Sequence, residues 1–344
     1  MQMTFRWYGK NDPVTLEKIR QIPGVTGIVS AIYDVPVGEA WSPERIMQLK
    51  KEVEDAGLTL SVIESVPVHE DIKMGCGDRD RYIENYCTTL KNLAKAGIDC
   101  VCYNFMPVFD WTRSDLAHKL PDGSNALIYD DETVKKMNPL SGDLSLPGWD
   151  ASYTKDDMRS LLEKYRSITE EDLWNNLKYF LDRVIKVAEE VKVKMAIHPD
   201  DPPWSIFGLP RIITNKKNIE RFLKLYDSKY NGLTLCSGSL GVDAKNDIPD
   251  IIRTFCDRIH FAHIRNVKIT GEHCFEEAAH KTDAGSLDIF EIIKAYHDCG
   301  FDGYIRPDHG RMIWGETGRP GYGLYDRALG AVYINGIWEA LERS

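Results

Sequence analysis

Apolar runs alternate with helical patterns along almost the whole chain, and this alternation predicts the fold. Eight runs are typical of buried strands, at residues 5–9, 25–31, 58–64, 99–105, 193–198, 233–238, 259–265 and 303–308. Continuous apolar runs favour parallel strands covered on both faces, and the helices between them supply the crossovers. Eight such units close most naturally into a barrel. We therefore predict an α/β fold, a single (β/α)8 TIM barrel domain over residues 1–344.

Local helix signals support this spacing. Ser42 and Pro43 are a typical N-cap and first helical residue, and Gly57 ends the amphipathic pattern that follows them. Thr169 is followed by two glutamates, which favour a helix N-terminus because they complement the helix dipole. Further helical patterns cover 79–96, about 169–190 and 325–342, and two more begin near residues 249 and 287.

Two segments are far longer than the loops of about two to six residues that normally join a strand to its helix. They cover about 106–168 and 267–286, and the first contains many turn-forming and aromatic residues, as in WTRSDL and LPGWD. Each follows a predicted strand, so both would lie on the C-terminal face of the barrel. We expect them to form a lid or a substrate wall, with oligomer contacts as the alternative.

Composition and charge narrow the class of protein. The chain has 344 residues, of which 43% are hydrophobic and 28% charged, as in globular proteins. A formal net charge of −10 without a basic cluster disfavours nucleic acid and anionic membranes as partners. The N-terminus lacks a signal-peptide pattern, and no apolar stretch reaches the ~18 residues of a membrane span. We expect a cytoplasmic protein, a homo-oligomer with a dimer favoured, whose eight scattered cysteines are reduced thiols.

Four potential metal ligands stand at or near the C-terminal ends of four successive predicted strands. They are His198, Cys236, His263 and Asp308. A single histidine or cysteine beside an apolar run is usually a packed core residue, but the repeated placement favours a shared site. Two imidazoles, a thiolate and a carboxylate suit a divalent first-row transition metal, such as Mn, Fe, Co or Zn, better than Ca or Mg.

Residues beside these ligands suggest an anionic substrate and proton transfer. Arg265 and Arg306 each share a strand face with one of the ligands, so we predict that both reach the barrel mouth and bind a substrate carboxylate. The alternative is that each arginine neutralises a neighbouring aspartate. His309, next to Asp308, and Tyr325, near the last helix, are candidates for the acid and the base, although a tyrosine there is most often a packing residue.

Six motifs that span most of the chain occur together. They are YNFMPVFDWTRSDL (103–116), HPDDPP (198–203), LCSGSLG (235–241), FAHIRN (261–266), RPDHG (306–310) and GYGLYDRALG (321–330). Jointly they resemble the D-mannonate dehydratase family of metal-dependent, xylose-isomerase-like barrels. The resemblance implies a hydro-lyase that converts D-mannonate to 2-keto-3-deoxy-D-gluconate in hexuronate catabolism. It also implies Mn²⁺ or Fe²⁺ as the cofactor.

Under this resemblance each candidate residue has an expected role. The four ligands hold the metal, Arg306 and Arg265 bind the sugar acid, and His309 and Tyr325 transfer protons. A metal-dependent sugar isomerase or epimerase is a rival function, although such sites usually have more carboxylate ligands and a second metal. A non-catalytic protein that binds sugar acids is the other. Product analysis discriminates among the three.

Overall fold

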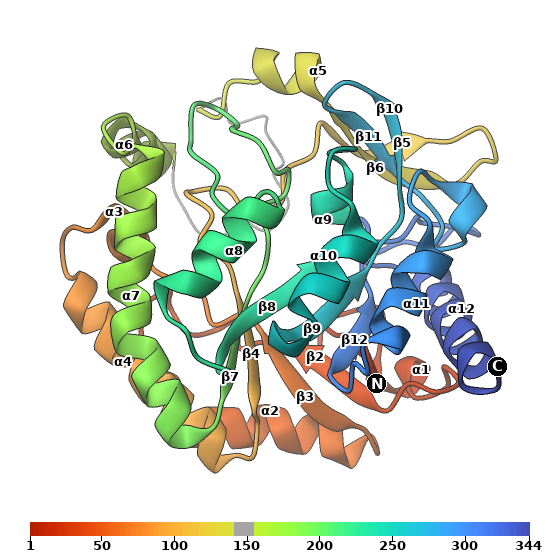
Figure 1. Cartoon of the computed structure of the whole chain (residues 1–344), viewed down its shortest axis with the longest axis horizontal. Coiled ribbons are helices and arrows are strands. Elements are labelled where there is room, and N and C mark those ends of the chain that lie inside the picture. Colours follow the sequence, from red (N-terminus) through yellow and green to blue (C-terminus); the bar gives the residue numbers. More distant parts are fainter. Residues whose placement is uncertain (141–154) are drawn as a thin grey trace.

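A closed barrel of eight parallel strands is the main feature of the computed structural model, which describes residues 1–140 and 155–344 (Figure 1). The barrel strands are β1 (Gln2–Arg6), β2 (Gly27–Ser30), β3 (Thr59–Glu64), β4 (Cys100–Tyr103), β7 (Lys194–Ile197), β8 (Asn231–Cys236), β9 (Ile259–Ile264) and β12 (Tyr304–Pro307). Their order around the barrel is β1-β12-β9-β8-β7-β4-β3-β2. The predicted barrel is confirmed.

Most of the helices cover the outside of the barrel, and the others lie at its top (Figure 1). They are α1 (Leu16–Ile19), α2 (Pro43–Asp55), α3 (Glu70–Met74), α4 (Arg79–Lys95), α5 (Asp131–Lys136), α6 (Lys155–Tyr165), α7 (Glu170–Val191), α8 (Lys216–Leu225), α9 (Ser237–Gly241), α10 (Ile248–Phe255), α11 (Ile289–Asp298) and α12 (Tyr325–Glu342), with short 3-10 turns η1 (Cys256–Arg258) and η2 (Thr282–Ala284). The predicted N-caps are confirmed: Ser42 caps α2, and Thr169 forms a capping box with Asp172 at the start of α7. None of the helices that the structure describes is long and apolar enough to cross a membrane.

The first strand differs from its prediction in a way that matters for the site. The apolar run at 5–9 predicted a strand there, but β1 covers Gln2–Arg6. Gln2 and Met3 pair with β12, and Thr4 to Arg6 pair with β2, so pairing partners on both sides set the boundaries. Arg6 is therefore the last residue of its strand. It lies at the C-terminal end of the barrel and not in its middle.

The two predicted insertions meet in a second sheet that the sequence did not predict. The first insertion supplies β5 (Asp115–Lys119) and β6 (Asn125–Asp130), and the second supplies β10 (Val267–Gly271) and β11 (Cys274–Glu277). All pairs are antiparallel, in the order β10-β11-β6-β5. Because β10 follows β9 almost directly, this sheet lies at the C-terminal face of the barrel (Figure 1). The turn-rich motif LPGWD (146–150) lies outside the described residues.

A small apolar cluster forms the floor of that face. Its buried members come from five barrel strands and are Val29, Val62, Cys100, Cys102, Ala196 and Phe261. The ring of Phe261 meets the ring of His263 edge-on, with centroids 4.5 Å apart. His263 is two residues further along the same strand, so both side chains point to the same side of β9. The cluster therefore supports a predicted metal ligand from below and excludes water from beneath it.

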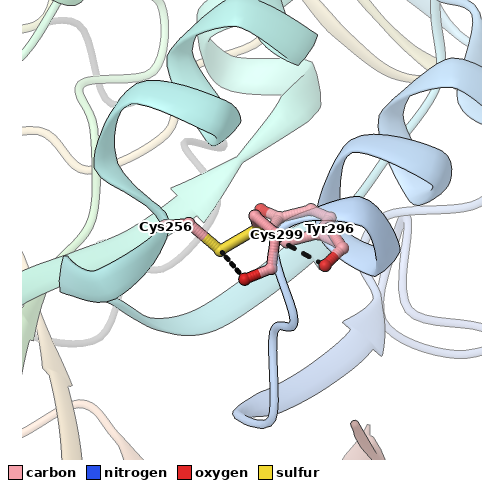
Figure 2. Close-up of a disulfide and its surroundings, with 3 residues drawn as sticks. All are labelled: Cys256, Tyr296 and Cys299. Atoms are coloured by element: carbon pink, nitrogen blue, oxygen red, sulfur yellow. Dashed lines mark hydrogen bonds between the residues drawn. A yellow bond between two sulfur atoms is a disulfide. The ribbon is translucent and has the colours of Figure 1, made fainter.

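One pair of cysteines contradicts the expectation of reduced thiols. Cys256 and Cys299 form a disulfide between the C-terminal ends of α10 and α11, with their Cα atoms 6.4 Å apart (Figure 2). The two helices precede β9 and β12, which are neighbours in the barrel, so the tertiary fold brings together two residues 43 positions apart. The other six cysteines are free, as expected.

Candidate active site and metal centre

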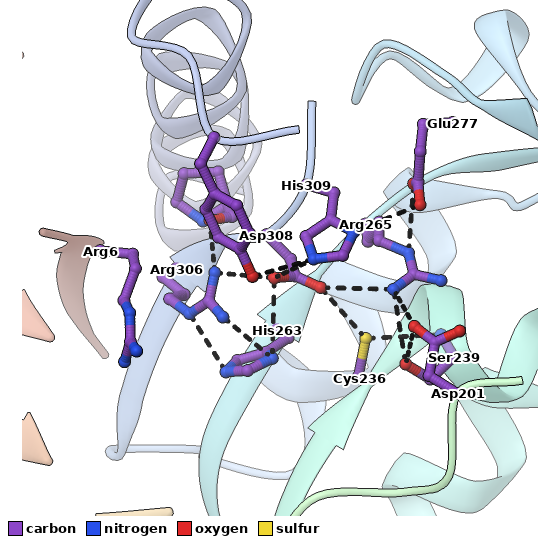
Figure 3. Close-up of polar contacts among 12 residues, drawn as sticks. Arg6, Asp201, Cys236, Ser239, His263, Arg265, Glu277, Arg306, Asp308 and His309 are labelled. Atoms are coloured by element: carbon purple, nitrogen blue, oxygen red, sulfur yellow. Dashed lines mark hydrogen bonds and ion pairs between the residues drawn. The ribbon is translucent and has the colours of Figure 1, made fainter. Parts of the chain in front are cut away.

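The four predicted metal ligands lie at the C-terminal ends of four adjacent barrel strands. Cys236 ends β8 and stands in register with His263 on β9. His198 directly follows β7, and Asp308 directly follows β12. Parallel strands end at one edge of a barrel, so the four side chains lie together at its mouth. Figure 3 shows three of them, Cys236, His263 and Asp308, close to one another.

The distances between ligand atoms fit a metal site. His198, Cys236 and His263 each offer one atom, and these atoms all lie within 4.8 Å of one another. Asp308 is outside this closest group, but its Oδ2 is 3.4 Å from Sγ of Cys236 and its Oδ1 is 4.0 Å from Nδ1 of His263. Nδ1 of His198 is 2.7 Å from the carbonyl oxygen of Pro199, which leaves Nε2 for a metal. This donor set suits a divalent transition metal.

Asp308 is held between two buried arginines. Nη1 of Arg306 is 2.8 Å from Oδ1 of Asp308, and Nη1 of Arg265 is 3.5 Å from Oδ2. Burial opposes ionisation of the carboxyl group, but His309, Arg306, His263 and Arg265 together keep the pKa of Asp308 well below its usual value. Asp308 is therefore an anionic donor at neutral pH.

Acidic and basic side chains also alternate on the side of the site that is nearest to the second sheet. Arg265 also contacts Asp201 at 2.7 Å, and Arg113 contacts Asp201 at 3.0 Å and Glu277 at 2.8 Å. Burial would raise the pKa of Glu277, but Arg265 and Arg113 outweigh it and hold that pKa at about 2. Arg113 precedes β5 and Glu277 ends β11, so each insertion sends a charged side chain into the site.

Arg306 and Arg265 are occupied by these carboxylates. Besides Asp308, Arg306 contacts Oε1 of Glu64 at 2.9 Å, and Nε of Arg265 lies 3.3 Å from Oε2 of Glu277. Both arginines are buried. These contacts match the alternative reading of the sequence, in which each arginine neutralises neighbouring acids. Their role in binding substrate stays a prediction.

His309 lies next to the cluster and is held from two sides. Its Nδ1 is 3.3 Å from Oε1 of Glu277, and its Nε2 is 2.8 Å from the hydroxyl of Tyr322. A carboxylate beside Nδ1 favours the tautomer with the proton there, which makes Nε2 the acceptor for the phenol. Burial raises the pKa of Tyr322 well above its usual value, so the phenol keeps its proton.

Tyr325 does not join this group. It is the first residue of α12, its residue surface is 42% exposed, and its ring packs against that of Trp314 at 5.4 Å. Tyr322, three residues earlier in the same motif, contacts His309 instead. The segment before α12 has no regular period, so spacing alone could not separate the two tyrosines. Their shared motif indicated that a tyrosine of this segment lies at the site, but not which of the two.

The sequence also did not identify several charged residues of the site. Asp201 and Arg113 lie in motifs that carry the family resemblance, HPDDPP and YNFMPVFDWTRSDL, so a signal for them was present. Glu64 ends a predicted strand, as the metal ligands do. Glu277 had no local signal, because only pairing of β11 with β6 and β10 sets its position.

Solved structures with the same architecture define the class of fold. D-psicose 3-epimerase from Clostridium cellulolyticum H10 aligns with a TM-score of 0.56 at 16% identity, covering 100% of this chain and 97% of the other. L-ribulose 3-epimerase aligns similarly, with a TM-score of 0.57 at 14% identity, covering 99% and 95%. The chain thus has the parallel barrel fold of sugar epimerases.

Similarity over the whole chain then identifies the family. The D-mannonate dehydratase (UxuA) family model matches residues 1–344. Mannonate dehydratase 2 of Halalkalibacterium halodurans is 63% identical over 343 residues, which is 99% of each chain. The crystal structure of mannonate dehydratase from Streptococcus suis aligns with a TM-score of 0.93 at 54% identity, covering 100% of this chain and 95% of that one. The chain belongs to the D-mannonate dehydratase family.

Proposed function

We propose that this chain is a metal-dependent hydro-lyase that converts D-mannonate to 2-keto-3-deoxy-D-gluconate in hexuronate catabolism. The observation that carries the proposal is the contact between the cluster of potential metal ligands and the buried pair His309 and Tyr322. Removal of water across C2 and C3 needs stabilisation of the negative charge left by the C2 proton, and groups that move two protons. Identity of 63% to a mannonate dehydratase over nearly the full length supports the substrate.

Four side chains would hold the metal, with Mn²⁺ or Fe²⁺ proposed: His198, Cys236, His263 and Asp308. When bound, the metal would polarise substrate oxygens and stabilise the developing negative charge. Arg306 and Arg265 contribute by keeping Asp308 ionised. His198 is oriented by its contact with the Pro199 carbonyl.

His309 and Tyr322 would carry the two proton transfers. The contact with Glu277 favours a proton on Nδ1 of His309, so Nε2 is unprotonated and accepts from the Tyr322 hydroxyl. Nε2 could take the C2 proton of the substrate once that hydroxyl turns from it to the substrate. Tyr322 keeps its proton and would give it to the departing C3 hydroxyl group, which leaves as water. We assign the base to His309 and the acid to Tyr322.

We also propose that the sheet built by the two insertions is a wall of the substrate pocket. Support comes from its ties to the site: Glu277 of β11 contacts His309, and Arg113 before β5 contacts Glu277. Through these contacts the wall would fix the orientation of the imidazole.

Product analysis tests the proposed function. The Mn²⁺-loaded protein is incubated with a panel of aldonates and the products are identified by NMR. We expect a 2-keto-3-deoxy acid from D-mannonate. An isomeric sugar would instead support an isomerase or epimerase, and binding without any product would support a sugar-acid binding protein.

We further propose that the chain forms a homodimer through α12. Tyr325, Leu329 and Val332 are exposed apolar residues on one face of this helix, and the exposed Trp314 packs against the first of them. Such a patch is typical of a protein–protein interface. We expect sedimentation velocity to give a dimer for the natural chain and a monomer for Leu329→Glu. A natural chain that sediments as a monomer would contradict the proposal.

A further inference from the structure

Arg6 is a buried guanidinium group with unused hydrogen-bond donors. It ends β1, and its residue surface is only 6% exposed. Nη2 donates to the Tyr33 hydroxyl at 3.1 Å, but Nε and Nη1 have no hydrogen-bond partner among the residues that the structure describes. Leaving donors of a buried cation unsatisfied is costly, so an acceptor supplied by a ligand would stabilise this arrangement.

Arg6 is also the least neutralised of the arginines around the cluster. Its ion-pair partner is Glu64, with Nη1 3.5 Å from Oε2, and the same carboxylate is closer to Arg306, at 2.9 Å. Arg265 also has two donors without a hydrogen-bond partner in the described parts of the chain, Nε and Nη2, but it lies near three carboxylates and is fully buried. The difference between the two arginines is therefore the number of nearby carboxylates. The β1 side of the site therefore carries positive charge that its own acids do not balance.

Arg6 is linked by contacts both to the candidate metal ligands and to the proposed proton-transfer residue Tyr322. Glu64 links it to the metal ligand His263, whose Nε2 is 3.5 Å from Oε2 of Glu64. Its guanidinium also lies over the Tyr8 ring at 4.8 Å, and Tyr8 packs against Tyr322 with centroids 4.9 Å apart. Figure 3 shows Arg6 beside Arg306 and His263 at one side of the cluster.

We propose that Arg6, and not Arg306 or Arg265, binds the C1 carboxylate of the substrate. This inference rests on the proposed function, in which the substrate is a sugar acid. Nε and Nη1 make no hydrogen bond, so the guanidinium can donate charge-assisted hydrogen bonds to the carboxylate oxygens. The carboxylate is bonded to C2, so holding it fixes the C2 proton relative to the metal ligands and His309. Negative charge spreads onto the carboxylate as that proton leaves, which strengthens the contact.

Binding of an anion and of its neutral counterpart tests this assignment. D-gluconate carries the carboxylate, whereas D-glucitol has a hydroxymethyl group in its place and the same configuration at the other carbons. Dissociation constants are measured by calorimetry on Mn²⁺-loaded natural protein, Arg6→Gln and Arg6→Lys, with metal content determined for each. We expect Arg6→Gln to weaken D-gluconate binding about 10- to 100-fold while D-glucitol binding changes less than about threefold. Arg6→Lys keeps the charge but loses the fork, so its loss should be smaller.

Arg211→Gln is the matched control. Arg211 is 5% exposed, and its Nε and Nη1 also have no hydrogen-bond partner in the described parts of the chain, but its Nη2 donates to the backbone of Phe109. We expect its preference for D-gluconate over D-glucitol to stay within about threefold of the natural protein.

Two outcomes would overturn the assignment: an unchanged preference in Arg6→Gln, or the loss of preference in Arg211→Gln instead. If Arg6→Gln does not fold or retain metal, Arg6→Lys is judged by the same criterion. The Arg6 assignment is tested by binding of D-gluconate. The proposed function would fail separately, if the natural protein formed no keto-deoxy acid from D-mannonate.

Discussion

Chelation of the divalent metal is expected to abolish dehydration of D-mannonate, and added Mn²⁺ or Fe²⁺ to restore it. The chain places soft and hard donors in one cluster at the barrel mouth, and its arginines help to keep Asp308 anionic. A bound metal typically contributes several kcal/mol of charge stabilisation, so we expect turnover to fall by at least about 10³-fold. Turnover is measured from the appearance of 2-keto-3-deoxy-D-gluconate, with metal content determined in parallel. Full activity of the metal-free protein would contradict the metal site.

Removing single ligands should have the same effect without unfolding the barrel. His198→Ala and Asp308→Ala should lose both metal and turnover, while circular dichroism stays close to that of the natural protein, since residues at the C-terminal face of such barrels serve function more than stability. His297→Ala is the control, because His297 lies on α11 and packs against Trp338, outside the cluster. Retained metal in both ligand variants would remove these residues from the site.

Tyr322→Phe is expected to lower kcat by about 10²- to 10⁴-fold, the usual contribution of a positioned acid or base. The change removes only the phenolic oxygen that contacts Nε2 of His309. Tyr325→Phe is a matched control from the same motif: its hydroxyl is on an exposed residue outside the cluster, and we expect nearly natural turnover. The reverse result, a loss in Tyr325→Phe alone, would restore the role predicted from sequence.

His309→Asn should lower turnover by a similar factor, because it keeps a polar side chain but removes the imidazole. If His309 takes the C2 proton, this variant should also lose exchange of that proton with solvent deuterium, whereas Tyr322→Phe should keep it. The comparison requires that the natural enzyme shows exchange in ²H₂O. Exchange that persists in His309→Asn would assign the base to another residue.

Local physical chemistry explains why so much of the barrel was predictable. Continuous apolar runs must be buried, helices between them carry their own N-cap and proline signals, and the strand and helix pattern admits few topologies. The positions of the candidate metal ligands were predictable for the same reason. Cys236 and His263 end or nearly end their strands, and all parallel strands end at one face.

Contacts between distant segments were not predictable. The disulfide of Cys256 with Cys299 depends on two helices becoming neighbours through β9 and β12. The contact of Glu277 with His309 depends on pairing between the two insertions. Neither contact leaves a periodic pattern in the sequence, since each is set by where the chain returns in space.

The sequence by itself determined the barrel, the strands that carry the candidate metal ligands and the family. These follow from burial of apolar runs, from local helix signals and from residues with distinctive chemistry. Only the tertiary structure decided which residues beside the candidate ligands are placed to bind substrate or transfer a proton. Strand pairing ends β1 at Arg6, the path before α12 brings Tyr322 to His309, and carboxylates occupy Arg306. Orientation and charge balance depend on partners far apart in the chain, so they are fixed only when the barrel closes.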